Sequence, residues 1–342
     1  MLTDALSAGG MSIPQITGEH NDNLLAMMNQ GASANNPIDM IATATDDQLD
    51  KIRQADADGL ILKQQDFHLD IIGHEIHGVV NLVGLSLGLA AGLFIALYVG
   101  FEVSYDRHFK NARRMYRIVR SDFTMTPYLL AAGLRGVAPE IEASTAVRRA
   151  ESAGSSRLTI AVENRPFEES ACFYVDRTFF SVFDATFLEG DPGRALSHPR
   201  AAVLTRSAAL RFFGATDCLG RVLMVNRTLP FQVEAVVESP PANSHFRYAV
   251  LLPTEAGPEV TGDDDRMSWT SWNYLLYVLL RRNASPRAVR DKLPLGFPEE
   301  RRAPPEGSWQ NPADLRLQRV TDIHLRSRLR EELEPNGDIR WV

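Results

Sequence analysis

Cysteine is scarce in this chain of 342 residues, where only Cys172 and Cys218 occur. Two cysteines exclude a disulfide-dense mini-protein and a four-cysteine zinc site, and the sequence leaves open whether the two form a disulfide bond. Basic residues are outnumbered by acidic ones, 36 to 43, and this balance argues against a general nucleic-acid-binding protein. The Walker A pattern G-x-x-x-x-G-K-[ST] is also missing, so the chain does not bind and hydrolyse ATP through a P-loop.

Apolar residues are plentiful, at 44% against 23% charged, which excludes a fully disordered or collagen-like chain. The length suits two to three domains. From Gly78 to Phe101 no residue is charged. A helix of this length extends about 36 Å, enough to cross a hydrocarbon core of about 30 Å. We therefore predict a single transmembrane helix at 78–101 rather than a buried core helix, and it begins too late to be a cleaved signal peptide.

Glycines recur within this apolar segment at Gly84, Gly88 and Gly92, a spacing that places them on one face of a helix. Small residues at this spacing allow another helix to approach closely in lipid. We therefore expect membrane lipid around the segment and a second copy of the chain along its glycine face.

Acidic residues are concentrated before the apolar segment. Residues 1–77 hold three basic and twelve acidic residues, whereas residues 78–342 hold 33 basic and 31 acidic ones. This shift marks a boundary, so we predict an acidic N-terminal arm at 1–77 and a large domain at 102–342. Within the arm, residues 45–57 have the capping threonine, the acidic first turn and the apolar stripe of a short helix.

Part of the arm resembles a known enzyme family. Asn36-Pro37-Ile38-Asp39-Met40 and the Ala-Thr pattern that follows resemble a fragment of an NDP-forming acyl-CoA synthetase. The nucleotide site and the phosphorylated histidine of that family are missing, so the resemblance implies no activity here. A disordered acidic arm is the alternative interpretation.

Three histidines, His68, His74 and His77, lie close together before the apolar segment. In His74-Glu75-Ile76-His77 one residue separates the glutamate from the second histidine, whereas the zincin pattern needs two. A third ligand is not evident. We therefore predict structural or solvent-facing histidines here, and we predict no catalytic residue, no cofactor site and no metal site in the chain.

The segment that follows the apolar run carries a second resemblance. Residues 81–120 combine a glycine-rich span with Glu102-Val103-Ser104-Tyr105-Asp106-Arg107 and resemble the first transmembrane helix and exit segment of MacB/FtsX-type ABC transporter permeases. That family usually reads E-x-S-Y-D-R-F-H, and here His108-Phe109 replaces Phe-His. The resemblance continues in an ordered series, which is Tyr174-Val175-Asp176, Leu188-Glu189-Gly190-Asp191-Pro192, Ala202-Val203-Leu204-Thr205, Phe212-Phe213-Gly214, Leu219-Gly220-Arg221 and Ser239-Pro240-Pro241-Ala242-Asn243-Ser244-His245. Residues 79–255 are covered nearly continuously, and the series resembles the MacB-like periplasmic core domain.

Periodicity within the large domain indicates both strands and helices. Val222 and Met224, and then Phe231, Val233 and Ala235, alternate with polar neighbours as in half-buried strands. Three further elements are expected from caps and apolar runs, which are a helix at 206–213 ending at Gly214, a buried strand at 273–280 and a helix at 285–292 that starts with Ser-Pro. We therefore predict an α+β extracytoplasmic domain in two subdomains that stands on one transmembrane helix.

Several polar and aromatic groups could be mistaken for sites. Asp263-Asp264-Asp265 is predicted to be a solvated loop rather than a cation site, because no spaced ligand set follows. Ser244 and His245 are neighbours in sequence, which rarely places a hydroxyl and an imidazole correctly for catalysis, and the family resemblance implies a structural loop. An aromatic group is predicted to lie in the core or in an interdomain seam rather than in a ligand cage, and it comprises Trp269, Trp272, Tyr274 and Tyr277.

The resemblance implies a permease subunit of an ABC exporter or mechanotransmission complex in the bacterial inner membrane, and not an enzyme. Its expected partners are a separate ABC ATPase and a periplasmic adaptor, with no nucleic acid. Two alternatives stay open, which are a single-span extracytoplasmic interaction or sensor domain without transport, and a fragmentary or fused gene product. Permeases of this kind have four spans, so we expect the chain to be truncated after the first helix and the periplasmic domain.

Two arguments about orientation disagree. The resemblance places the arm in the cytoplasm and the large domain in the periplasm. The positive-inside rule favours the reverse, because only Lys63 precedes the span closely while six basic residues follow it. These six are Arg107, Lys110, Arg113, Arg114, Arg117 and Arg120. We follow the resemblance, because a large folded domain that matches the family so closely is unlikely to have moved to another compartment.

Overall fold

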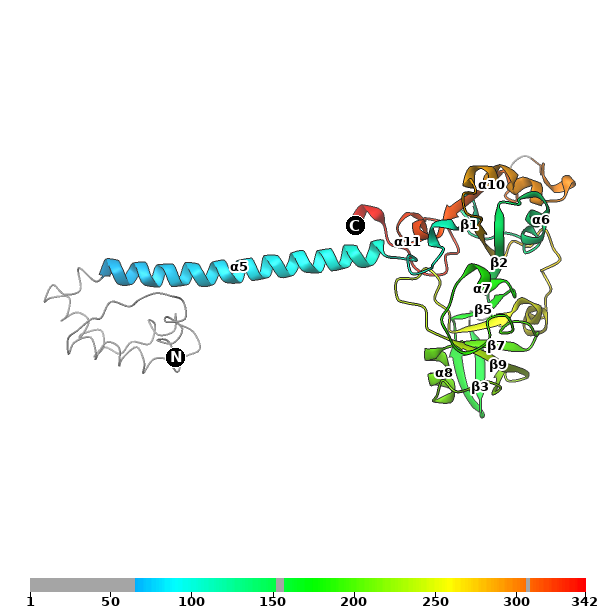
Figure 1. Ribbon diagram of the computed structural model, residues 1–342, viewed down its shortest axis with the longest axis horizontal. Helices are drawn as coiled ribbons and strands as arrows, with labels where there is room; N and C mark the ends of the chain where they lie inside the picture. Colours follow the sequence, from blue (N-terminus) through cyan, green and yellow to red (C-terminus); the bar gives the residue numbers. More distant parts are fainter. Residues whose placement is uncertain (1–64, 152–156, 306–307) are drawn as a thin grey trace. The chain divides into compact units, whose positions relative to one another are not determined.

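The computed structural model describes residues 65–151, 157–305 and 308–342, with side chains described from Val80 onward. The chain divides into two compact units, Met1–Ala91 and Gly92–Val342. One long helix, α5 (Gln65–Val103), contains the predicted membrane segment (Figure 1). It begins well before Gly78, so the end of the predicted arm is helical. The expected helix at 45–57, the synthetase-like segment and the side chains of the three clustered histidines lie outside this description.

From Val80 to Phe101 the side chains of α5 are almost all apolar and lie on every side of the helix. Val80–Val103 has a mean hydropathy of 2.3, and the described protein buries none of this stretch. Leu87, Leu89 and Phe94 are each more than 70% exposed. A core helix of a soluble domain would be covered by other elements, so the buried-helix alternative is wrong. Val80–Val103 is the one candidate membrane span in the described part of the chain, and its length is that of a transmembrane helix.

One mixed sheet of twelve strands organises the unit that follows (Figure 1). Its order is β12-β1-β11-β2-β5-β10-β7-β9-β8-β3-β4, with β6 paired to β9. The strands are β1 (Met115–Arg120), β2 (Ile141–Arg149), β3 (Leu158–Val162), β4 (Arg165–Glu169), β5 (Cys172–Val175), β6 (Phe187–Gly190), β7 (Ala201–Thr205), β8 (Val222–Val225), β9 (Leu229–Val237), β10 (Val250–Pro253), β11 (Leu275–Leu280) and β12 (Leu315–Arg319). The pairs β5–β10 and β7–β9 are parallel and the other pairs are antiparallel.

Short helices connect and cover these strands. They are α6 (Leu130–Val137), α7 (Phe179–Val182), α8 (Arg206–Phe213), α9 (Gly257–Thr261), α10 (Pro286–Lys292) and α11 (Ile323–Arg326), with 3₁₀ turns η2 (Ala112–Arg114), η3 (Thr254–Ala256), η4 (Leu293–Gly296), η5 (Glu299–Arg301), η6 (Pro312–Asp314), η7 (Val320–Asp322) and η8 (Ile339–Trp341). In Figure 1, α6 and α10 lie at one end of the domain and α8 lies at the other. This arrangement confirms the α+β class. The two predicted subdomains stay a prediction, since one sheet is continuous through the domain.

Local signals explain where the predicted elements begin and end. The hydroxyl of Thr205 accepts a hydrogen bond from Ala208 N at 3.3 Å, and Gly214 ends α8 with a φ of 76°. A residue with a Cβ is strained at this φ, so glycine suits the position. Both ends of the predicted helix are therefore confirmed. Ser285 stands at the N-cap of α10 with Pro286 after it, although the serine side chain makes no capping hydrogen bond.

One strand presents the opposite face from the one predicted. In β8, Leu223 and Val225 are buried while Val222 is half exposed. The residues that alternate with Val222 and Met224 are themselves apolar, so the predicted alternation with polar neighbours is wrong here and the pattern could not identify the buried set. In β9, Phe231, Val233 and Ala235 are buried as predicted.

The buried apolar side chains gather in three clusters. The central cluster includes Phe179, Phe183 and Phe246. The α8 cluster packs around α8, with Phe212 and Phe231 at its centre, and the α10 cluster lies under α10, α6 and β12. Trp272 and Tyr274 are buried, and Tyr277 is fully buried, so these three aromatic residues lie in the core as predicted.

Candidate functional site at the end of the membrane helix

The residues that leave α5 turn sharply and attach to a distant loop. Ser104 closes the turn, with its N and Oγ donating to Phe101 O at 3.1 and 2.6 Å. Asp106 follows with a φ of 61°, and its N donates to Asn243 O at 3.0 Å. The amide of Asn243 donates to Ser104 Oγ at 2.7 Å in return. The exit segment 102–106 is thus bonded to the Ser239–His245 loop by both backbone and side chain.

Asp106 and His245 form the buried centre of this attachment. Asp106 is inaccessible to solvent and His245 is 2% exposed. His245 Nδ1 lies 2.8 Å from Asp106 Oδ1, and the backbone N of His245 donates to the same oxygen at 3.0 Å. The Ser244 hydroxyl donates to Phe246 O at 3.1 Å and makes no hydrogen bond with the His245 ring. The carboxylate therefore orients the imidazole, and this Ser–His pair has no nucleophile geometry.

His245 continues the contacts into the sheet. Its Nε2 lies 3.0 Å from the hydroxyl of Tyr277 on β11. Burial raises the pKa of Tyr277, so the phenol stays neutral and can donate or accept a hydrogen bond. Arg117 on β1 lies beside this tyrosine. The polar chain from Asp106 therefore reaches the middle of two strands.

Arg117 is completely buried and is held by a bidentate ion pair. Its Nη1 and Nη2 donate to Glu332 Oε2 and Oε1 at 2.7 and 2.9 Å, and Nη2 also donates to Gln318 at 2.8 Å. Burial by itself would lower the pKa of Arg117, but the bonds to Glu332 outweigh it and the pKa is raised. The pair joins strand β1 to the C-terminal segment.

The C-terminal segment also touches the helix end directly. Glu102 Oε2 lies 2.8 Å from His324 Nε2. The ring of His324 stacks on Tyr105 with centroids 3.3 Å apart and planes 4° from parallel. A Cβ on Gly337 would come within 2.9 Å of the Glu102 carboxylate and 3.1 Å of the His324 ring, so a larger residue there would displace these side chains. We call the whole set the junction, and it comprises Glu102–Asp106, Asn243–His245, Arg117, Tyr277, His324, Glu332 and Gly337.

The junction is a network of paired polar groups at the end of α5. Its charged groups are paired with one another. Each hydrogen bond or ion pair needs a particular geometry, which would be lost if the bonded segments shifted. Within the described ranges no three histidine, cysteine, aspartate or glutamate side chains gather as a metal site. The geometry therefore fixes the chain leaving α5 against three separate parts of the domain.

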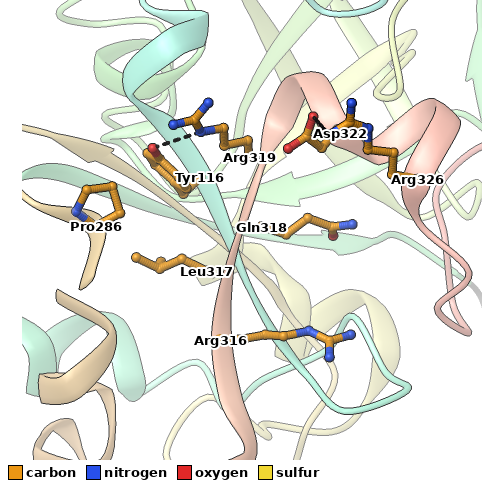
Figure 2. A pocket seen from close by; sticks show the side chains of 8 residues that line it. All are labelled: Tyr116, Pro286, Arg316, Leu317, Gln318, Arg319, Asp322 and Arg326. Carbon is orange, nitrogen blue, oxygen red and sulfur yellow. Dashed lines mark hydrogen bonds and ion pairs between the residues drawn. The ribbon is translucent and has the colours of Figure 1, made fainter. Parts of the chain in front are cut away.

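Two shallow hollows lie on the described surface, and the second borders the junction at Gly337. One, of about 400 Å³, follows strand β12 and is lined by Tyr116, Pro286, Arg316, Leu317, Gln318, Arg319, Asp322 and Arg326 (Figure 2). The other lies beside Tyr98 and Trp341. Neither is lined by a histidine or cysteine.

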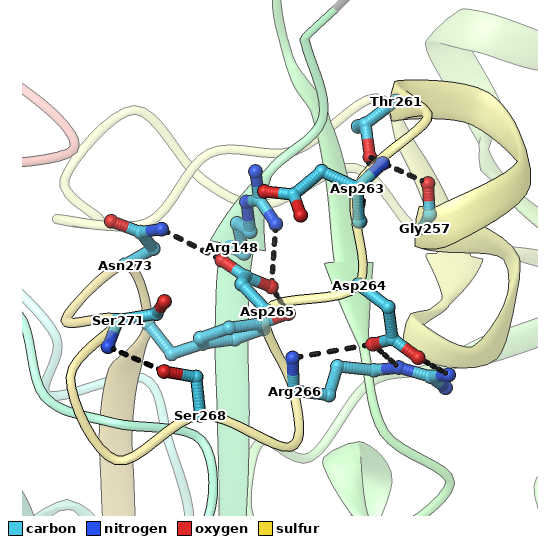
Figure 3. Close-up of polar contacts among 11 residues, drawn as sticks. Arg148, Gly257, Thr261, Asp263, Asp264, Asp265, Arg266, Ser268, Ser271 and Asn273 are labelled. Atoms are coloured by element: carbon cyan, nitrogen blue, oxygen red, sulfur yellow. Dashed lines mark hydrogen bonds and ion pairs between the residues drawn. The ribbon is translucent and has the colours of Figure 1, made fainter.

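The three consecutive aspartates do not share one environment (Figure 3). Asp263 and Asp264 are exposed, as expected of a solvated loop. Asp265 is buried, which corrects the prediction for this residue. Its carboxylate accepts from Arg148, Asn273 and Tyr274 at 2.7–2.8 Å, so it anchors the loop to β2 and β11.

Both cysteines are free thiols and both are buried in the α8 cluster. Burial raises the pKa of the Cys172 thiol and also that of the Cys218 thiol. A thiol that stays protonated is a poor nucleophile, so neither cysteine is a candidate reactive group.

Residues 79–294 match the sequence profile of the MacB-like periplasmic core domain, which is more than half of the chain. The chain belongs to this family. Its members are parts of ABC-type permease components, so the domain that α5 anchors to the membrane is extracytoplasmic. No curated protein sequence matches the chain.

Solved structures of such domains are similar in fold. A domain of a permease protein from Porphyromonas gingivalis is 20% identical and covers 66% of this chain and 96% of its own, with a TM-score of 0.51. The periplasmic region of MacB from Actinobacillus actinomycetemcomitans is 15% identical, covers 63% and 94%, and has a TM-score of 0.43. The extracellular domain of the noncanonic ABC-type transporter YknZ from Gram-positive bacteria is 13% identical, covers 60% and 99%, and has a TM-score of 0.39. Of these three, the Porphyromonas gingivalis domain shows a likeness of fold, and at 20% identity the likeness concerns the fold alone.

The extracytoplasmic assignment also explains the basic residues after the span. Arg117 and Arg120 are buried in the folded domain, and Arg114 pairs with Glu142 at 2.6 Å. Half of the six basic residues thus belong to the packing of the domain. The positive-inside rule counts charges in short loops, because large domains translocate largely regardless of charge.

Proposed function

We propose that the chain is the permease subunit of an ABC exporter or mechanotransmission complex in the bacterial inner membrane, with its acidic arm in the cytoplasm and no catalytic activity of its own. In this proposal a separate ATPase moves α5 from the cytoplasmic side. The movement passes through the junction to the extracytoplasmic domain. Direct ATP hydrolysis by this chain is not part of the proposal, since the sequence has no Walker A pattern.

The junction is the observation that supports this function most. A domain that is only tethered to a membrane needs no more than a flexible linker after its helix. Here Ser104 and Asp106 follow the helix directly and are bonded to residues about 140 positions later. Glu102, still within α5, contacts His324. A rotation or displacement of the helix end therefore pulls on the Ser239–His245 loop and on the C-terminal segment.

The proposed assembly includes a second copy of the chain within the membrane. Gly84, Gly88 and Gly92 each leave open space where a Cβ would stand, with no atom within 4 Å. Such a face can be approached closely by another helix in lipid. A periplasmic adaptor and membrane lipid complete the proposed partners, and nucleic acid is not among them.

The test is the stimulation of an ATPase by the chain. An ABC ATPase is isolated with the chain from native membranes by cross-linking, identified by mass spectrometry and reconstituted with it in liposomes. We expect the wild-type chain to stimulate ATP hydrolysis and Asp106→Asn to lose most of this stimulation. The matched variant Glu238→Gln, in an exposed ion pair with Arg206, should keep it.

Two results would contradict the proposal. Equal stimulation by all three chains would show that the junction does not couple. Failure of any ABC ATPase to associate would favour the alternative function, a membrane-anchored extracytoplasmic interaction or sensor domain without transport.

A further inference from the structure

Strand β12 forms an open edge of the sheet. It pairs with β1 on one side and with no other described strand. In an antiparallel pair, every second residue of an edge strand directs its N–H and C=O away from its neighbour. Such groups can form hydrogen bonds with another extended chain. This edge also lies outside residues 79–294, the region that matches the family.

The residues that line the hollow beside β12 lie to both sides of the strand (Figure 2). Successive residues of a strand point to opposite faces. Leu317 and Arg319 lie opposite Ile118 and Tyr116 on one face, while Arg316 and Gln318 belong to the other. Residues of both faces line the same hollow of about 400 Å³. Such a hollow must run along the edge, where an added strand would lie.

The charge around the edge has one predominant sign. Arg316 and Arg319 are exposed on the strand, and Arg326 follows on α11. Arg316 donates to Ser121 O at 2.7 Å, Arg319 donates to the Tyr116 hydroxyl at 3.2 Å, and Arg326 lies 3.6 Å from Asp322. Each guanidinium has five N–H groups, so each keeps donors for a further acceptor. Carboxylates of a bound chain would meet these donors.

The opposite edge of the sheet, strand β4, differs from β12 in its hydrogen-bond donors and in its charge. Strand β4 contains Pro166, which has no N–H to donate, and its charges are mixed, with Arg165 beside Glu168 and Glu169. A second copy of β12 is also a poor occupant of the β12 edge, because antiparallel self-pairing would bring arginines near arginines. The occupant that fits is an acidic extended segment.

We propose that β12 binds an extended acidic segment of an extracytoplasmic partner protein, which adds to the sheet as a further strand. Its main chain pairs with β12, and its carboxylates bind Arg316, Arg319 and Arg326. In strand addition of this kind, the main-chain hydrogen bonds provide affinity and the flanking side chains provide specificity. This binding is independent of coupling to an ATPase, so it can succeed or fail separately from the proposed function.

The experiment measures binding of synthetic peptides to the full chain in lipid nanodiscs by fluorescence anisotropy. The probe is a ten-residue peptide that alternates glutamate with threonine and valine. One comparison peptide has lysine in place of glutamate, and another keeps the glutamates but has alternate backbone nitrogens methylated. We expect saturable binding of the unmodified acidic peptide only, with slower hydrogen exchange at the β12 amides.

Variants of the chain separate the edge from general charge attraction. Arg316→Glu with Arg319→Glu should weaken binding by about tenfold or more, because two attractive contacts become repulsive. Arg165→Glu on β4 reverses one charge at the other edge and should leave binding unchanged. If circular dichroism shows that the charge-reversed variant is unfolded, the double variant Arg316→Ala with Arg319→Ala, which only removes the two charges, takes its place. Equal binding of the methylated peptide, equal weakening by Arg165→Glu, or no saturable binding of the acidic peptide would each overturn the proposal.

Discussion

The α8 cluster is built mainly from apolar side chains such as Phe212 and Phe231, whereas the junction buries Asp106, Arg117 and His245. Apolar contacts are non-directional, so they hold a core together without specifying one angle. Buried charges are stable only when particular atoms meet. The region next to the membrane helix is thus held by hydrogen bonds and ion pairs, which fix the relative orientation of the segments that they join. The four predictions below test this difference, beginning with the largest effect.

The buried pair of Arg117 and Glu332 should give the largest effect. Arg117→Met removes the cation and leaves the Glu332 carboxylate half-buried without its partner. We expect the free energy of unfolding to fall by about 3–5 kcal/mol, the usual cost of removing one partner of a buried ion pair. Denaturant unfolding of the full chain in detergent, followed by tryptophan fluorescence, measures the change. A loss below about 1 kcal/mol would mean that this pair behaves like a surface pair.

Asp106 tests the centre of the junction. Asp106→Asn keeps a residue type that tolerates a positive φ, so the backbone turn is preserved. It removes the negative charge that faces His245 Nδ1, and a cost of about 1–3 kcal/mol is expected for a buried polar group that loses its partner. The same denaturant experiment measures it. Wild-type stability in this variant would show that the Asp106–His245 contact is not a source of stability.

Gly214 tests the region built on apolar contacts. At its φ of 76° the Gly214→Ala substitution has no steric neighbour within 4 Å, so only backbone strain acts. The expected cost is about 1 kcal/mol. Because Gly214 ends α8, far from the junction in sequence and packing, ATPase stimulation should be unchanged. A loss of stimulation as large as that of Asp106→Asn would contradict the separation of the two regions.

The exposed pair of Arg206 and Glu238 should give the smallest effect. It has the same residue types as the buried pair, and its Nε and Nη2 bonds of 2.9–3.1 Å are as well formed. Both side chains are nearly half exposed, however, and solvent screens their attraction. Glu238→Gln should leave the melting temperature unchanged within error. A shift comparable to that of Arg117→Met would mean that burial does not determine how much each ion pair contributes to stability.

The elements of this fold were predictable where their signals are local. The Thr205 cap and Gly214 end bound α8 from within a short stretch. The apolar run before Arg281 predicted a strand at 273–280, and β11 begins two residues later, at Leu275. The faces of β8 were not predictable, because Val222 and Leu223 are both apolar.

The junction could not be assembled from the sequence in the same way. Asp106 and His245 are 139 positions apart, and Arg117 and Glu332 are 215 apart. No periodicity links residues at such separations. One signal was available, since Arg117 stands among the apolar residues Met115, Ile118 and Val119. A charged residue in such a strand needs a buried partner, but the sequence does not identify which acidic residue supplies it. Asp265 was missed for a similar reason, because a run of three aspartates resembles a solvated loop.

The most direct test of the account measures how firmly the junction holds the end of α5. Nitroxide labels are placed on Leu97 in the helix and Leu210 in α8, both exposed, after Cys172 and Cys218 are replaced by alanine. Pulsed electron paramagnetic resonance in nanodiscs then gives the distribution of distances between the labels. The account predicts a narrow distribution for the otherwise wild-type chain and for Glu238→Gln, and a clearly broader one for Asp106→Asn and Arg117→Met. Equally narrow or equally broad distributions in all four chains would contradict the claim that these buried polar bonds fix the direction in which the helix enters the domain.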